Sequence, residues 1–78
     1  MTVYAVTAFA IDPTTGDALS SPRVEEIDNE TNEIFRQCSS PWEVEDAFLA
    51  FWNRLNAWWE YDFPANHEKV VVVSVVAR

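Results

Sequence analysis

The chain contains little of what small proteins use for covalent stability or metal binding. Its 78 residues include one cysteine, one histidine and one glycine. A single cysteine excludes an intramolecular disulfide framework, which argues against a secreted mini-protein held together by disulfides. One cysteine and one histidine also exclude a zinc site with four Cys or His ligands from one chain. We expect no metal and no cofactor.

Long hydrophobic runs are missing as well. The longest apolar segments are residues 47–52 and 70–73, far shorter than the roughly 20 residues that span a bilayer. The pattern of a signal peptide, a charged segment followed by an apolar stretch, is not found. The sequence therefore predicts a cytoplasmic protein without a membrane partner.

Positive charge is scarce. Five Lys and Arg residues stand against 13 Asp and Glu residues, which gives a net charge of −8. Because phosphate binding needs clustered Lys and Arg, direct binding of nucleic acid is disfavoured. A basic protein partner is favoured instead, since complementary charge accelerates the encounter.

The chain is rich in apolar residues, with 49% hydrophobic and 14% aromatic side chains. This composition is typical of a folded domain and not of an acidic disordered tail. We expect a single α+β domain over residues 1–78. Residues 2–11 alternate as a strand with two largely apolar faces. The segment DPTTGD predicts a turn into a second strand at 18–27, where Pro22 requires an edge position or a bulge.

The segment EIFRQC at residues 33–38 supports two interpretations. As a third strand it places Ile34, Arg36 and Cys38 on one face. The rival interpretation is a short helix over residues 31–37. We favour the strand because the apolar pair at 34 and 35 has no helical continuation.

A helix begins with a much clearer signal. Ser40, Pro41 and Glu43 occupy the N-cap, first and third helical positions, which is a capping box with the favoured proline. The helix is predicted to run from residue 41 to residue 60 or 61. Its apolar stripe comprises Val44, Ala47, Phe48, Phe51, Trp52, Leu55, Trp58 and Trp59.

The last predicted strand, KVVVVSVVA at residues 69–77, is apolar on both faces, with Val71, Val73, Val75 and Ala77 on one of them. The order is β-β-β-α-β, an α+β fold with one mostly antiparallel twisted sheet and a single amphipathic helix packed on one face. The first and last strands are expected at the centre of the sheet and parallel to each other. One helix covers one face only. The other is covered by curling of the sheet or by a second copy, in a homodimer.

No constellation of residues indicates catalysis. Cys38 and His67 are the only candidates for a nucleophile and its base, and nothing in the sequence places them together. We interpret Cys38 as structural and His67 as a solvated loop residue. The spacing of Asp28, Glu30 and Asn32 suggests a calcium loop, but the glycine that such a loop needs at its sixth position is absent. We expect a protein that is not an enzyme.

An acidic run is the first candidate for partner binding. It places five carboxylates in nine residues, at a spacing comparable to that of phosphates along a nucleic-acid strand, with few basic residues nearby. One interpretation is a solvated surface and the other a binding surface. The run comprises Glu25, Glu26, Asp28, Glu30 and Glu33.

The start of the helix is the second candidate. Trp42 and Leu49 fall opposite the apolar stripe, and Glu45 and Asp46 lie between them in the sequence. An exposed aromatic residue with an acidic rim is typical of an interface hot spot. In the alternative interpretation Trp42 covers the loop before the helix.

The leading strand MTVYAVTAFA, the acidic segment RVEEIDNETNE and the single aromatic helix together resemble small acidic phage-encoded anti-CRISPR proteins. The resemblance rests on the character of the whole chain and not on a motif. It implies binding to a basic, nucleic-acid-handling surface of a host defence complex, in the host cytoplasm, so that target DNA is blocked.

Two functional hypotheses follow. In the first, the protein is an inhibitor whose carboxylates substitute for phosphates in a basic channel, with Trp42 as an anchor. In the second, it is a non-enzymatic accessory or assembly subunit that homodimerises through a Val-rich sheet face.

Overall fold

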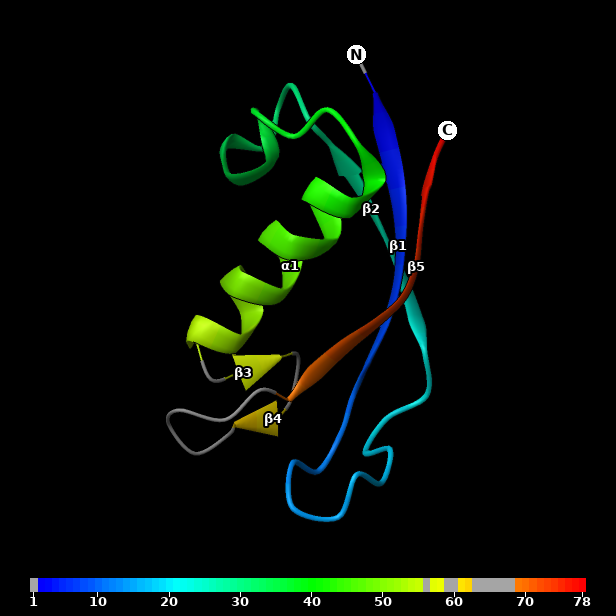
Figure 1. The fold of residues 1–78 in the computed structure, drawn as a ribbon, viewed down its shortest axis with the longest axis vertical. Helices are drawn as coiled ribbons and strands as arrows, with labels where there is room; N and C mark the ends of the chain where they lie inside the picture. Colours follow the sequence, from blue (N-terminus) through cyan, green and yellow to red (C-terminus); the bar gives the residue numbers. More distant parts are fainter. Residues whose placement is uncertain (1, 56, 59–60, 63–68) are drawn as a thin grey trace.

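The fold was analysed in a computed structural model that describes residues 2–55, 57–58, 61–62 and 69–78. It confirms the α+β class, with an antiparallel sheet and one α-helix packed on one of its faces (Figure 1). The elements are β1 (Val3–Ala10), β2 (Arg23–Asp28), the 3-10 turn η1 (Glu33–Phe35), α1 (Pro41–Leu55), β3 (Ala57–Trp58), β4 (Tyr61–Asp62) and β5 (Val70–Ala77).

The main sheet has the strand order β2-β1-β5, with both neighbours antiparallel to the central β1. The turn from β1 toward β2 forms as predicted. The Asp12 carboxylate accepts a hydrogen bond from the Thr14 backbone N–H at 2.8 Å, and Gly16 adopts a positive φ of 79°, which glycine tolerates without strain. Strand β2 lies at an edge of the sheet, which is one of the two positions predicted from Pro22. It runs from Arg23 to Asp28 and not over residues 18–27, so Pro22 precedes the strand instead of lying inside it.

The position of the last strand differs from the prediction. Strand β5 lies at the second edge and runs antiparallel to β1, whereas a central, parallel strand was expected. The cause is the missing third strand. Because β2 is the last strand of this sheet before α1, the crossover through the helix returns β5 parallel to β2, with β1 between them.

The segment after β2 forms a 3-10 turn where a third strand was favoured. The Asn32 side chain accepts a hydrogen bond from the Ile34 backbone N–H at 3.3 Å and thereby caps η1. The turn also places Phe35 in the core, where it is 3% exposed. The strand interpretation is therefore wrong, and the local helical alternative is closer to the structure.

Helix α1 ends at Leu55, several residues before the predicted end at 60 or 61. Trp58 belongs to β3 and pairs with Tyr61 of β4. Its buried ring packs edge-on against Phe48, with the ring centroids 6.2 Å apart. The apolar stripe could not show this early end, because burial of Trp58 satisfies the hydrophobic pattern in either conformation. No helix in the described part of the chain is long and apolar enough to cross a membrane.

The core lies between the sheet and α1. Strand β1 alternates strictly, so that every second residue is buried against the helix side. The buried apolar residues are Tyr4, Val6, Ala8, Ala10, Ile27, Phe35, Cys38, Val44, Phe48, Trp58 and Val70. The opposite face, which we call the open face, carries the alternate residues of all three strands.

A bulge in β5 changes which valines share a face. The pairing with β1 shifts between Thr7 and Ala8, which leaves Val73 without a partner in the ladder. As a result Val70, Val72, Val75 and Ala77 share the face of β1 that packs on α1. The predicted grouping of Val71 and Val73 with Val75 and Ala77 is wrong, because strict alternation across the strand does not survive the extra residue.

Helix α1 begins at the predicted residue, and Glu43 caps it, but the two reciprocal side-chain to backbone bonds of a capping box do not form. One Glu43 carboxylate oxygen accepts hydrogen bonds from the hydroxyls of Ser39 at 2.9 Å and Ser40 at 3.0 Å. The Ser39 hydroxyl bond, followed by the Ser40 hydroxyl bond, holds the pKa of Glu43 below its usual range. The sequence SSPWE therefore sets both where the helix begins and the charge state of its cap.

We expect Glu43→Gln to lower stability at pH 7 and to have much less effect near pH 3. A carboxyl whose folded-state pKa is lowered contributes stability above its unfolded value of about 4.3, and this contribution is lost as the pH falls through the folded pKa. Urea denaturation of both proteins at the two pH values measures the difference. Glu45→Gln, which removes a carboxylate from the same stretch of helix, is the control. An equal loss for Glu43→Gln at both pH values would contradict this assignment.

Candidate protein-binding surface

The acidic run of the sequence is divided among three places. Glu25 lies opposite the core residue Val6, so it shares the face of the sheet that packs on α1. Glu26 and Asp28 alternate with it and lie on the open face. Glu30 and Glu33 are exposed in the turn that follows. The five carboxylates therefore do not form a single row that follows the spacing of phosphates.

Several of these carboxylates interact with other groups of the chain. The Asp28 carboxylate accepts a hydrogen bond from the Glu30 backbone N–H at 2.9 Å. Glu25 is partly buried, and desolvation raises its pKa although the charge of Arg23 opposes the shift. Glu26 forms an ion pair with Arg78, which follows β5 and reaches across the open face. The charge that β2 presents to a partner is therefore smaller than the sequence suggests.

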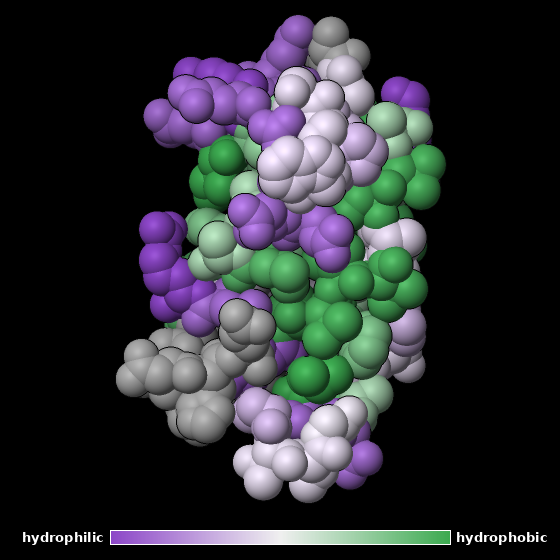
Figure 2. All heavy atoms as spheres, viewed as in Figure 1, coloured by the Kyte–Doolittle hydropathy of each residue, from purple (hydrophilic) through white to green (hydrophobic). Residues whose placement is uncertain are grey.

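The rest of the acidic run lies at one end of the molecule. There the segment from the end of β2 through η1 lies beside the first turns of α1 (Figure 1), and η1 contacts the helix. Figure 2 shows hydrophilic side chains over the turn at this end. We call this surface the acidic end, and it comprises Asp28, Glu30, Glu33, Trp42, Glu45 and Asp46.

Trp42 is the prominent apolar group of the acidic end. Its side chain is 69% exposed, so the interpretation in which it covers the preceding loop is wrong. Leu49 does not join it as an exposed pair, because Leu49 packs against the core cluster. Asn53, one turn further on the same side of α1, accepts hydrogen bonds from the backbone of β5. This side of the helix is therefore exposed at Trp42 but packs toward the core and β5 at Leu49 and Asn53, a change along the helix that helical periodicity alone did not reveal.

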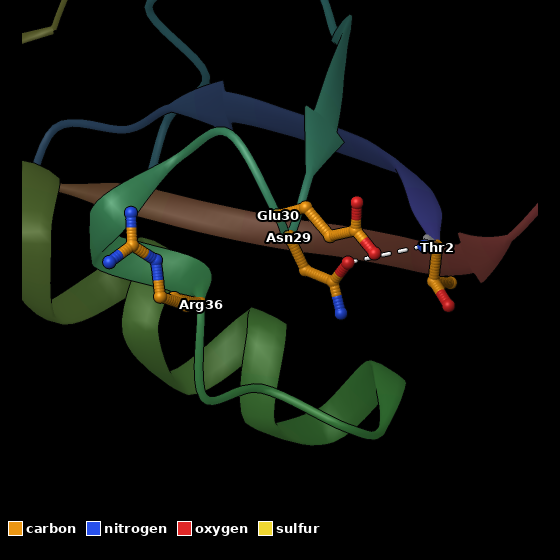
Figure 3. A pocket seen from close by; sticks show the side chains of 4 residues that line it. All are labelled: Thr2, Asn29, Glu30 and Arg36. Carbon is orange, nitrogen blue, oxygen red and sulfur yellow. Dashed lines mark hydrogen bonds between the residues drawn. The ribbon is translucent and has the colours of Figure 1, made fainter.

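Asn29 fixes the chain at the base of the acidic end, a role that the sequence analysis missed. Its side-chain oxygen accepts a hydrogen bond from the Thr2 backbone N–H at 3.1 Å (Figure 3). Its amide nitrogen donates to the Cys38 carbonyl at 3.2 Å. Thr2, Asn29, Glu30 and Arg36 line an open pocket of about 380 Å³. In the sequence Asn29 lies within an acidic segment, and no local pattern indicates that its side chain bonds to Thr2 and Cys38.

Of the two residues considered for catalysis, Cys38 lies in the described part of the chain. Cys38 is buried, and desolvation, with a smaller effect of the Glu43 charge, raises the pKa of its thiol. A raised pKa keeps a cysteine in the unreactive thiol form. His67 lies outside the described residues. Among the described residues, no three His, Cys, Asp or Glu side chains are grouped to hold a metal ion.

Comparisons with protein-family models, with curated proteins and with solved structures gave no match to this chain. The function is therefore argued from the geometry and charge of the molecule itself.

Proposed function

We propose that the protein is a non-enzymatic binding protein that occupies a basic, nucleic-acid-binding surface of a host defence complex of the CRISPR type and blocks target DNA binding. The observation that carries the proposal is the acidic end, where exposed carboxylates and an exposed tryptophan lie at the same end of the molecule. The partner is a basic protein or complex in the cytoplasm.

The acidic end supplies two kinds of binding energy. Glu30, Glu33 and Asp46 are exposed carboxylates that would face Lys and Arg side chains otherwise paired with phosphates. Their attraction steers the encounter and is weakened by salt, since the Debye length is about 8 Å at physiological ionic strength. Trp42 offers a large, rigid apolar surface of the kind that dominates interface energetics when it becomes buried.

The test compares charge reversals at the acidic end with one at the far end of the sheet. We expect Glu33→Lys or Asp46→Lys to weaken partner binding at least about tenfold, because each replaces attraction by repulsion in a complementary interface. The immobilised protein captures partners from a nuclease-treated bacterial lysate, and a salt gradient elutes them. Asp17→Lys, in the exposed turn between β1 and β2, is the matched control with the same change in net charge.

Equal retention of the captured complex by all three variants would contradict the proposal. Loss of binding by Asp17→Lys alone would move the binding surface to the opposite end of the sheet. Binding by the wild type that does not weaken with salt would also argue against a charged interface.

One observation favours the second candidate, an accessory or assembly subunit that homodimerises through a Val-rich sheet face. On the open face Val24 is 59%, Val71 37% and Val76 57% exposed. Exposed apolar patches of this kind mark interaction surfaces. Contact through this face would be nearly independent of salt, which distinguishes it from the acidic-end interface in the same elution experiment.

A further inference from the structure

The outer edge of β5 differs from the other edge of the three-stranded sheet. Its eight residues, VVVVSVVA, contain no charge, no proline and no glycine. The acidic strand β2 forms the opposite edge of the same sheet. Figure 2 shows hydrophobic side chains along the middle and right of the molecule, where β5 runs in Figure 1. Proteins usually protect long apolar edge strands with charges or proline, because such strands pair readily with another chain.

The hydrogen bonds to β1 show which backbone groups of β5 point away from the sheet. The Arg78 N–H donates to the carbonyl of Val3, the residue opposite it, at 2.8 Å. In an antiparallel ladder, hydrogen-bonded and non-hydrogen-bonded pairs alternate. Val76 therefore bonds to β1, whereas Val75 and Ala77 direct their N–H and C=O groups outward.

The start of this edge is already occupied, and its end is not. The Asn53 side-chain oxygen accepts hydrogen bonds from the backbone N–H groups of Lys69 at 2.9 Å and Val70 at 3.0 Å. Helix α1 thereby covers the first residues of the edge. The outward N–H groups of Val75 and Ala77 donate no hydrogen bond to another described residue.

The distribution of charge favours β5 over β2 as the edge through which a second copy of this chain pairs. Two molecules with a net charge of −8 repel each other, but the repulsion depends on which edges meet. If two β5 strands pair, the two β2 strands lie five strand spacings apart, or roughly 24 Å. This is about three Debye lengths at physiological ionic strength, so the acidic strands are screened from each other. Pairing through β2 would instead bring their carboxylates into contact.

We propose that two copies pair antiparallel through the outer edges of β5, forming a six-stranded sheet about a two-fold axis at Val76. In this register the outward N–H and C=O groups of Val75 exchange hydrogen bonds with those of the partner's Ala77. By symmetry, Ala77 exchanges the same two hydrogen bonds with the partner's Val75. Val76 then faces its own counterpart in a non-hydrogen-bonded pair on the open face. Both helices lie on the same side of the joined sheet. The inference is independent of the proposed acidic-end function.

The first test removes an outward donor without disturbing the fold. Ala77→Pro deletes an N–H that does not bond to β1, and a proline is tolerated at such an edge position. At a concentration of about 1 mM we expect the wild type to sediment as a dimer of twice 9.0 kDa. Ala77→Pro should remain a monomer at the same concentration. Ala77→Thr, which keeps the N–H, should remain dimeric. A monomeric wild type, or a dimeric Ala77→Pro, would overturn the proposal.

The second test fixes the register. Val76→Cys should form an intermolecular disulfide under mild oxidation, because facing residues of a non-hydrogen-bonded pair have Cα atoms about 4.5 Å apart. Ser74→Cys is the matched control on the same strand. In the proposed register the two Ser74 residues are roughly 13 Å apart along the strands, beyond disulfide reach. Cross-linking by Ser74→Cys but not by Val76→Cys, as in pairing through the open faces or in another register, would overturn it.

Discussion

Phe48→Ala is expected to lower the free energy of unfolding by about 3–5 kcal/mol. Phe48 is 1% exposed and lies at the centre of the contact between α1 and the rest of the core. Its ring centroid is 6.5 Å from that of Trp52 and 6.2 Å from that of Trp58. Truncation removes buried area, two aromatic contacts and the packing that holds β3 against the helix.

For a domain of this length the total stability is about 4–12 kcal/mol, so the variant should lose at least about a quarter of it and should unfold if the wild type lies near the lower limit. Urea denaturation followed by tryptophan fluorescence measures the loss. Phe51→Ala is the matched control, because it removes the same atoms from a partly exposed position on the same helix. If Phe51→Ala cost as much as Phe48→Ala, the core would not be centred where the structure places it.

Asn53→Ala is expected to cost about 2–4 kcal/mol, since it removes the acceptor for two partly buried backbone N–H groups. These belong to Lys69 and Val70, at the start of β5. The side chain therefore joins the end of α1 to the first residues of the edge strand. Without it, β5 should begin later and its first residues should exchange amide hydrogens faster.

The conservative variant separates hydrogen bonding from packing. Asn53→Asp keeps an oxygen acceptor of nearly the same size at the same position, so most of the stability should return at neutral pH. Thermal unfolding of the three proteins under one condition gives the comparison. A loss in Asn53→Asp equal to that in Asn53→Ala would mean that the two N–H groups do not depend on this oxygen.

Local sequence signals predicted the fold where a single residue forces a conformation. Ser40 and Glu43 gave the start of α1, and Pro22 gave the edge position of β2. The signals failed where two structures satisfy the same pattern. Burial of Trp58 suits a long helix or a short strand, and the early end of α1 depends on tertiary packing against Phe48. The wrong strand at 33–38 then gave β5 the wrong direction.

The candidate site was predictable in composition but not in arrangement. A run of acidic residues is visible in the sequence, yet alternation along β2 sends Glu25 toward the core side of the sheet and Glu26 toward Arg78. Neither the ion pair nor the half-buried carboxylate has a local signature, because each depends on strands that are distant in the sequence. The exposure of Trp42 was one of two alternatives, and only the packing of α1 decided between them.

The central claim is that the acidic end competes with nucleic acid for a basic surface, and a competition measurement tests it most directly. A complex captured by the immobilised protein is purified and bound to labelled target DNA, and the protein is added in increasing amounts. We expect DNA to be released as the protein approaches a one-to-one ratio to the complex, and Glu33→Lys to require a much higher concentration. Formation of a ternary complex that retains DNA at saturating protein would contradict the claim.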